Sequence, residues 1–164
     1  METVYCKNLS EVKKERESLE RKLKVKIEIK GRNILIQGEP LDEYVASIIL
    51  NAVSIGFPIK TACLLQDENF IFEKINIKSF TKRKNLSLIR ARIIGTYGKT
   101  KKTIEELAGC KIVLKDNIVG IIGQTDAVEY ALLGVTNIIK GTKQSNVYRY
   151  LEKINRERKK NLYK

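Results

Sequence analysis

An internal repeat constrains the fold of this chain more than any other feature of its sequence. Residues 19–56 can be laid over residues 104–141 with a constant offset of 85 positions and no gap. Overall identity is low, but the order of apolar runs, turns and glycines is shared, which indicates two copies of one structural unit. The identical pairs are Glu20 and Glu105, Lys26 and Lys111, Ile27 and Ile112, Lys30 and Lys115, Ile36 and Ile121, Gly38 and Gly123, Ala46 and Ala131, and Gly56 and Gly141.

The second copy has the clearer pattern of secondary structure. "FIFEKINI" alternates like a strand, and "NLSLIRARII" reads as a helix that starts near Asn85. Further on, "KIVLK" and "IVGII" read as two short strands joined by a tight turn at Asp116-Asn117, and an amphipathic helix follows Thr125 or Asp126. The predicted order is therefore strand, helix, glycine loop, helix, strand, strand, helix. The first copy shows a similar order from "ETVYC" onward.

The glycine loop between the first two helices of the second copy reads "IIGTYGKT", residues 93–100. Its Gly-Lys-Thr ending is also how phosphate loops of nucleotide-binding enzymes end, but those need Gly-x-x-x-x-Gly-Lys-Ser/Thr. The first glycine of such a loop would fall at Ile93, so the spacing leaves only a Gly-x-x-Gly. A loop of that length suits one or two phosphates of a nucleic-acid strand.

Charge is divided unevenly along the chain. The net charge is +13, yet residues 1–70 hold 11 basic and 11 acidic residues, whereas residues 71–164 hold 21 basic and 8 acidic ones. Ten basic residues and no acidic one lie between Lys74 and Ile104, around the glycine loop. A solvated lysine-rich surface is the alternative, but the balanced first half favours a polyanionic partner for the second.

The composition also sets limits on other functions. Histidine is absent, and Cys6, Cys63 and Cys110 form no Cys-x-x-Cys pair, so we expect no structural metal site and no cofactor. Three scattered cysteines suit a reducing compartment, which predicts a cytoplasmic protein. No apolar run is long enough to span a bilayer, so we expect no membrane partner.

The order of elements with Gly-x-x-Gly between the first two helices resembles the eukaryotic-type KH RNA-binding domain. Two such units, with "RIIGTYGKTKKTIEELAG", "VYRYLEKINRER" and "SIGF", resemble one family, the archaeal and eukaryotic KH-domain factor of small-subunit ribosome assembly (the partner-of-Nob family). The resemblance implies an α+β fold of two tandem type I KH-like domains, each a three-stranded antiparallel sheet with helices on one face. The implied boundaries are 1–69 for a degenerate first domain with a connecting helix, 70–143 for the RNA-binding domain, and 144–164 for a basic C-terminal helix.

The RNA-binding residues are predicted around the loop. Glycines without Cβ atoms let an RNA backbone come close, lysines in the next helical turn neutralise phosphates, and Tyr97 either stacks on a base or is merely exposed. Apolar side chains would form the groove floor, with Ile104 and Ile112 as further candidates unless they are plain core residues. The predicted set is Arg90, Arg92, Ile94, Gly95, Thr96, Tyr97, Gly98, Lys99, Lys101, Lys102, Val113 and Arg149.

The first copy departs from this pattern, because no glycine precedes Gly31 and no Gly-x-x-Gly exists near "CKNLSEVKK". We interpret it as a unit for packing or for a protein partner. The basic C-terminal stretch is either an additional phosphate contact or a solvated helix end.

The resemblance implies a non-enzymatic adaptor that clamps single-stranded ribosomal RNA near the 3′ end of small-subunit rRNA and assists 3′-end maturation. Its implied partners are that RNA, a Nob-type endonuclease, and other small-subunit assembly or initiation factors. Two alternatives stay open: a KH-domain adaptor in RNA decay or translation, and an enzyme that binds nucleotides. No catalytic residues are predicted.

Overall fold

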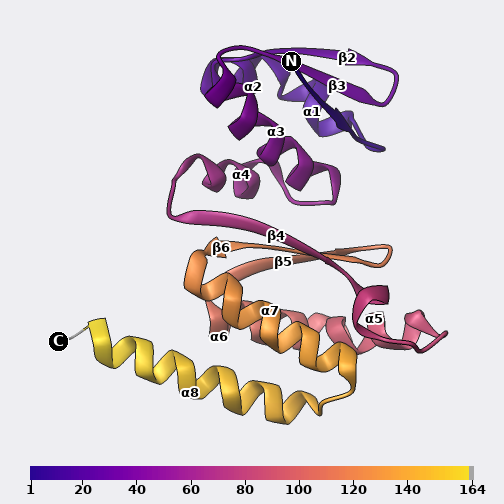
Figure 1. Cartoon of the computed structure of the whole chain (residues 1–164), viewed down its shortest axis with the longest axis vertical. Coiled ribbons are helices and arrows are strands. Elements are labelled where there is room, and N and C mark those ends of the chain that lie inside the picture. The colour runs from indigo at the N-terminus through magenta and orange to yellow at the C-terminus, as the bar shows by residue number, and fades with distance from the viewer. Residues whose placement is uncertain (163–164) are drawn as a thin grey trace. The chain divides into compact units, whose positions relative to one another are not determined.

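The computed structural model describes residues 1–162, which form two compact units, Met1–Phe70 and a second that starts at Ile71 (Figure 1). Each unit contains one three-stranded sheet. The strand order is β1-β3-β2 in the first and β4-β6-β5 in the second, so the last strand of each unit lies in the middle of its sheet. The predicted α+β class, with one three-stranded antiparallel sheet in each unit, is confirmed.

Both units follow the predicted order of elements. The first contains β1 (Glu2–Tyr5), α1 (Ser10–Lys14), α2 (Arg16–Leu23), β2 (Lys26–Lys30), β3 (Asn33–Gln37), α3 (Pro40–Ser54), α4 (Ile59–Ala62) and the 3-10 turn η1 (Cys63–Gln66). The second contains β4 (Phe70–Asn76), η2 (Ile77–Phe80), α5 (Leu86–Ile94), η3 (Thr96–Gly98), α6 (Lys99–Ala108), β5 (Cys110–Lys115), β6 (Ile118–Gln124), α7 (Thr125–Lys140) and α8 (Gln144–Leu162).

The backbone explains part of the repeat, because left-handed positions recur at the same offset of 85 residues. Such positions end a helix or close a tight turn, and an L side chain adopts them only at some cost. This geometry therefore belongs to the unit and was kept even where the residue type changed. The pairs are Lys24 (φ 58°) and Gly109 (φ 78°), Gly31 (φ 62°) and Asp116 (φ 53°), and Gly56 (φ 114°) and Gly141 (φ 105°).

The shared glutamates hold a helix against an edge strand in both units. Glu20 of α2 accepts a hydrogen bond from the backbone N–H of Ile27 at 2.8 Å, and Glu105 of α6 accepts one from Ile112 at 3.0 Å. Both N–H groups belong to edge strands, where they have no partner strand on that side. The carboxylate satisfies this donor and fixes the strand beside the helix that precedes it.

The shared glycines Gly38 and Gly123 lie at the end of the central strands. A Cβ atom on Gly38 would lie 3.0 Å from Val25 Cγ1, and one on Gly123 would lie 3.0 Å from Cys110 Cβ. Val25 and Cys110 themselves correspond in the repeat. A larger residue at either glycine would therefore require the neighbouring side chain to shift, which explains why both units have glycine there.

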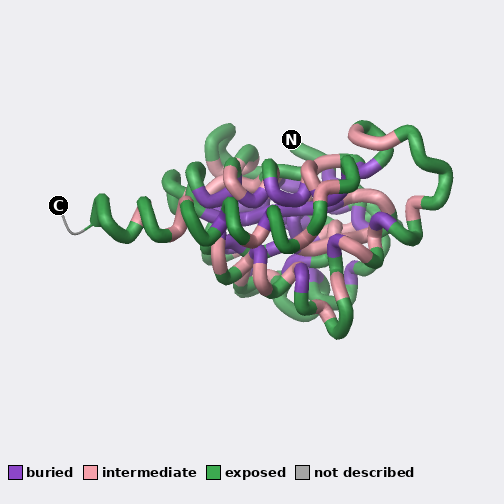
Figure 2. The backbone as a smooth tube through the Cα atoms, turned by 90° about the horizontal axis from the view of Figure 1, so that it is seen from below, coloured by how far each residue is buried: buried purple, intermediate pink, exposed green. Residues whose placement is uncertain are grey.

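In the second unit, α6 and α7 pack on the sheet and α8 runs along α6 and α7 (Figure 1). Val147 and Leu151 of α8 are buried, and Gly134 of α7 lets Val147 approach closely. Arg158 holds the other end of α8: it donates to Ala108 O at 3.0 Å and pairs with Asp126 at 3.2 Å. The stretch of α8 toward its C-terminal end is mostly exposed (Figure 2).

The three cysteines, Cys6, Cys63 and Cys110, are buried and free. Burial, with Glu105 nearby, raises the pKa of the Cys110 thiol to about 12. Such a thiol carries no appreciable thiolate at neutral pH.

Among residues 1–162, no helix combines the length and the apolar character that crossing a bilayer requires.

We expect Glu105→Ala to lower the free energy of unfolding by about 1–3 kcal/mol, because it leaves the Ile112 N–H without its charged acceptor. Urea unfolding followed by circular dichroism measures the change. Glu106→Ala is the matched control, since the neighbouring Glu106 is exposed. Equal unfolding midpoints for the two variants would show that the carboxylate does not hold the edge strand.

Candidate nucleic-acid interface

The Gly95–Gly98 loop is a single tight turn between α5 and α6. Gly95 ends α5 with φ 79° and ψ 173°, a conformation open almost only to glycine, and its carbonyl accepts from the Gly98 N–H at 3.2 Å. Tyr97 (φ 54°) and Gly98 (φ 75°) are also left-handed. Three positive φ angles in four residues turn the chain back at once, so α6 begins directly at Lys99.

The two glycines of this loop face different surroundings. A Cβ atom on Gly95 would collide with Thr100, at 2.6 Å from its backbone nitrogen, whereas one on Gly98 would meet nothing within 4 Å. Gly95 is thus required by packing within the protein. Of the two, only Gly98 presents an open backbone face of the kind that the sequence predicts for both.

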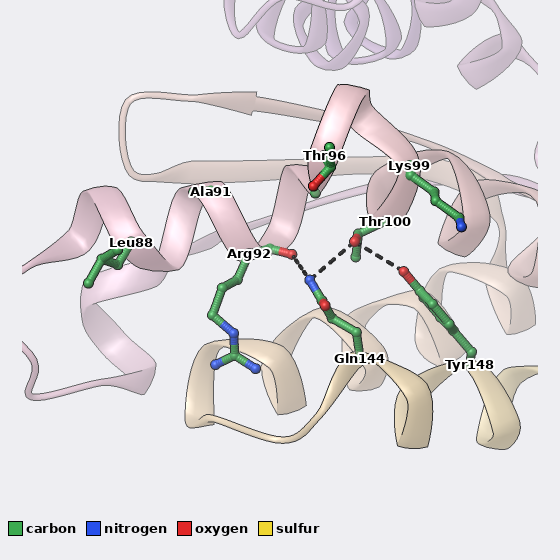
Figure 3. Close-up of a pocket in the computed structure, with 9 residues that line it drawn as sticks. Leu88, Ala91, Arg92, Thr96, Lys99, Thr100, Gln144 and Tyr148 are labelled. Atoms are coloured by element: carbon green, nitrogen blue, oxygen red, sulfur yellow. Dashed lines mark hydrogen bonds between the residues drawn. The ribbon is translucent and has the colours of Figure 1, made fainter.

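Thr100, which is buried, is the centre of a partly buried hydrogen-bond cluster behind the loop (Figure 3). Its hydroxyl accepts from Tyr148 Oη at 3.0 Å and from Gln144 Nε2 at 3.2 Å. Gln144 Nε2 also donates to the carbonyl of Arg92 at 2.9 Å. Two residues of α8, one turn apart, therefore hold both the end of α5 and the start of α6.

The two predicted arginines lie on different sides of α5. Arg90 donates to Asn117 Oδ1 at 2.6 Å, which places it at the turn between β5 and β6. Arg92 donates to the carbonyl of Thr142 at 2.8 Å and extends toward the segment between α7 and α8 (Figure 3). The structure therefore does not bring these two side chains together.

The predicted apolar floor separates into core and surface residues. Ile104 and Ile112 are 0% and 2% exposed and belong to the hydrophobic core, so they are core residues. Ile94 is 38% exposed, and Val113 is partly exposed on the edge strand β5. Of the four candidates, Ile94 and Val113 are the ones accessible from outside.

The cations and Tyr97 around the loop are largely open to solvent. Lys99 and Lys102 are exposed, while Lys101 is half-buried and pairs with Glu105 at 3.3 Å. Thr96 is exposed, and Tyr97 at the tip of the loop is fully exposed. Positive charge and an aromatic ring therefore surround the open face of Gly98.

Arg149 lies apart from the loop, on the outer face of α8. It is exposed, and three more exposed cations follow it at helical spacings that keep them on one face: Lys153, Arg156 and Lys160. We call these four residues the α8 basic stripe. No salt bridge involves them in the described part of the chain.

Sequence reasoning missed the contribution of Gln144 and Leu88. Together with Ala91 and Tyr148, they line a cavity beside the loop. No sequence pattern marks this cavity, because it forms only where α8 returns to the loop. Within residues 1–162 no group of three or more Cys, Asp or Glu side chains is placed to hold a metal ion.

A family model described as a eukaryotic type KH-domain (KH-domain type I), for the second KH domain of PNO1, matches residues 71–156. The chain belongs to the PNO1 family of KH-domain proteins. The match runs from β4 into α8 and includes the loop and the α8 residues that bind Thr100.

Individual relatives extend the similarity to the first unit. A KH domain-containing protein of Methanocaldococcus jannaschii is 29% identical over 152 residues, which are 88% of this chain and 66% of the relative. The RNA-binding protein PNO1 of Oryzias latipes is 32% identical over 135 residues, 77% of this chain and 55% of that protein. The chain thus spans between about half and two thirds of the length of these curated relatives.

A solved structure matches nearly the full chain. It is the complex of Dim2p with a/eIF2alpha and rRNA from Pyrococcus horikoshii OT3, with a TM-score of 0.87 and 27% identity. The match covers 95% of this chain and 94% of that one. That relative was therefore crystallised together with both a protein and an RNA.

We expect Gly95→Ala to destabilise the protein more than Gly98→Ala. Gly98→Ala places an L residue in the left-handed region at a cost of about 1–2 kcal/mol. Gly95→Ala adds a collision with Thr100 to a similar backbone strain, so a loss of about 3 kcal/mol or more is expected. Thermal and urea unfolding of the two variants measure the difference; equal losses would contradict the assignment of Gly95 to internal packing.

Proposed function

We propose that the chain is a non-enzymatic adaptor that binds single-stranded ribosomal RNA during assembly of the small ribosomal subunit. The proposed RNA segment lies near the 3′ end of small-subunit rRNA, and binding there assists 3′-end maturation. Membership of the PNO1 family supports this proposal, as does the rRNA complex of the Pyrococcus horikoshii relative. Its buried free cysteines fit a reducing, cytoplasmic setting.

The observation that carries the proposal is the open backbone face of Gly98. Nothing lies within 4 Å of the point where its Cβ would be, although the surrounding turn is tight. An RNA phosphate has room to approach the backbone there. Lys99 and Lys102 supply positive charge within one helical turn of that point, and Tyr97 supplies an exposed ring.

In this proposal the rest of the strand continues from the loop past the accessible apolar residues Ile94 and Val113, which would contact its bases. Arg90, which binds Asn117 at the turn between β5 and β6, would supply a further positive charge. Phosphate contacts position the strand, while base contacts select its sequence. The α8 basic stripe, which begins at Arg149, adds a separate surface for phosphates.

For the first unit we propose protein binding. Its α1 begins at Ser10 and is followed directly by α2, so the unit has no glycine loop between its first two helices. Its 11 basic and 11 acidic residues cancel, which removes the electrostatic attraction for RNA. A Nob-type endonuclease and small-subunit assembly or initiation factors are the proposed partners.

The glycine loop provides the first test. Gly98→Asp adds a Cβ atom and a negative charge at the proposed phosphate position, so it should abolish specific binding of the rRNA 3′-end segment. Fluorescence anisotropy with a labelled single-stranded RNA measures the affinity. Substitutions to Asp at other exposed positions add the same negative charge away from the loop and control for net charge. Glu106→Asp changes an exposed side chain without changing the charge, and it should leave binding unchanged. A folded Gly98→Asp protein with unchanged affinity would remove the loop from the interface.

The division of labour between the units provides the second test. We expect residues 70–164 to retain most of the RNA affinity and residues 1–69 to show almost none. Each phosphate contact contributes about −0.7 to the salt slope of single-strand binding, so the slope for residues 70–164 should nearly equal that of the whole chain. Comparable affinities for the two fragments would contradict the charge argument.

A further inference from the structure

A cavity of about 400 Å³ lies beside the Gly95–Gly98 loop, on the side of α8 (Figure 3). Its lining comes from the continuous stretch of α5, the loop and the first turn of α6, and from α8, which is distant in sequence. Neither Ile94 nor Val113, the accessible apolar residues named above, lines it. The lining residues are Leu88, Ala91, Arg92, Gly95, Thr96, Lys99, Thr100, Gln144 and Tyr148.

The cavity wall combines an apolar side with polar groups. Leu88 is 63% exposed and Ala91 is also exposed, although both lie in the middle of a helix beside buried isoleucines. Tyr148 adds an aromatic ring. An apolar, partly aromatic wall of this kind suits the flat face of a nucleic-acid base.

The polar groups suit the edge of a base and a phosphate. Gln144 Nε2 is engaged by Arg92 O and Thr100, while Gln144 Oε1 accepts no hydrogen bond from any described residue. That oxygen is therefore available to accept from an exocyclic amine. Lys99 lines the same cavity and is exposed, and it forms no salt bridge with a described residue.

We propose that this cavity takes one nucleotide of an RNA strand that continues past the loop. The inference rests on the proposed function, since Gly95 and Thr96 of the loop and Lys99 at the start of α6 form one wall of the cavity. A strand held at Gly98 thus passes directly beside the opening. The volume lies within the range of small-molecule sites, which begins at about 300 Å³, and is sufficient for a base with its ribose.

A nucleotide fits this cavity better than an acidic side chain of a protein partner. A carboxylate would use the cation Lys99 but would leave Leu88, Ala91 and the Tyr148 ring without contact. A base uses the apolar wall and the Gln144 oxygen together. A KH domain holds about four nucleotides. The site would therefore add one nucleotide to the RNA segment that the protein contacts.

The test varies RNA length and cavity size together. A tetranucleotide selected from a random single-stranded pool is compared with versions that carry two further nucleotides on the 5′ or the 3′ side. In the wild-type chain, extension on one side should raise affinity by about tenfold, the effect of one stacked base. Ala91→Trp, which fills the cavity from an exposed helix position, should remove that gain and leave tetranucleotide affinity unchanged.

Leu133→Trp is the matched control, because Leu133 is an exposed helix residue of α7 that does not line the cavity. It should keep the gain from the longer RNA. If Ala91→Trp fails to fold, Leu88→Glu replaces it, since a carboxylate at the exposed wall should repel the same nucleotide.

The outcomes separate the two proposals. If the wild-type chain binds the tetranucleotide but extension gives no gain, or the gain survives in Ala91→Trp, the cavity is not a nucleotide site and the proposed function stands. If extension gives the gain and only the cavity variant loses it, the inference holds. If no RNA binds the wild-type chain, both proposals fall together.

Discussion

The contact between Gly95 and Thr100 is the constraint on which the second unit's surface depends. Because a Cβ at position 95 would collide with Thr100, α5 and α6 meet with no space between them. That approach brings the Thr100 hydroxyl within reach of α8, where Gln144 and Tyr148 donate to it. The turn, the first residues of α6 and the start of α8 are therefore a single packed cluster, and the open face of Gly98 lies at its outer side.

This cluster has a consequence for recognition. A loop that must be ordered before it binds loses affinity because of the entropy of ordering, whereas a loop that is already held in place by hydrogen bonds loses less. In this chain the ordering comes from a helix about 45 residues farther along the sequence. The C-terminal helix is thus a support of the loop as well as a carrier of the exposed cations that begin with Arg149.

The sequence predicted the order of elements and the position of the loop, because each has a local signature, and the family resemblance of that order implied the fold class. Alternating apolar residues marked strands, Asp116-Asn117 marked a turn, and the offset repeat joined the two halves. It did not distinguish Gly95 from Gly98, or separate the buried Ile104 and Ile112 from the accessible Ile94 and Val113. The first difference arises from the way the tight turn folds Thr100 back against Gly95. The burial of Ile104 and Ile112 and the cavity beside α8 arise from contacts between distant segments, and no local pattern encodes them.

The left-handed backbone conformation of Tyr97 lowers the stability of the loop. This residue is left-handed and fully exposed, so its side chain adds strain to the turn without any packing in return. Glycine or asparagine would occupy the position at lower cost. The native loop therefore lies below its attainable stability, and selection for thermostability alone would replace the tyrosine. Compared with glycine or asparagine, tyrosine at this position lowers the folding stability but exposes an aromatic ring to solvent.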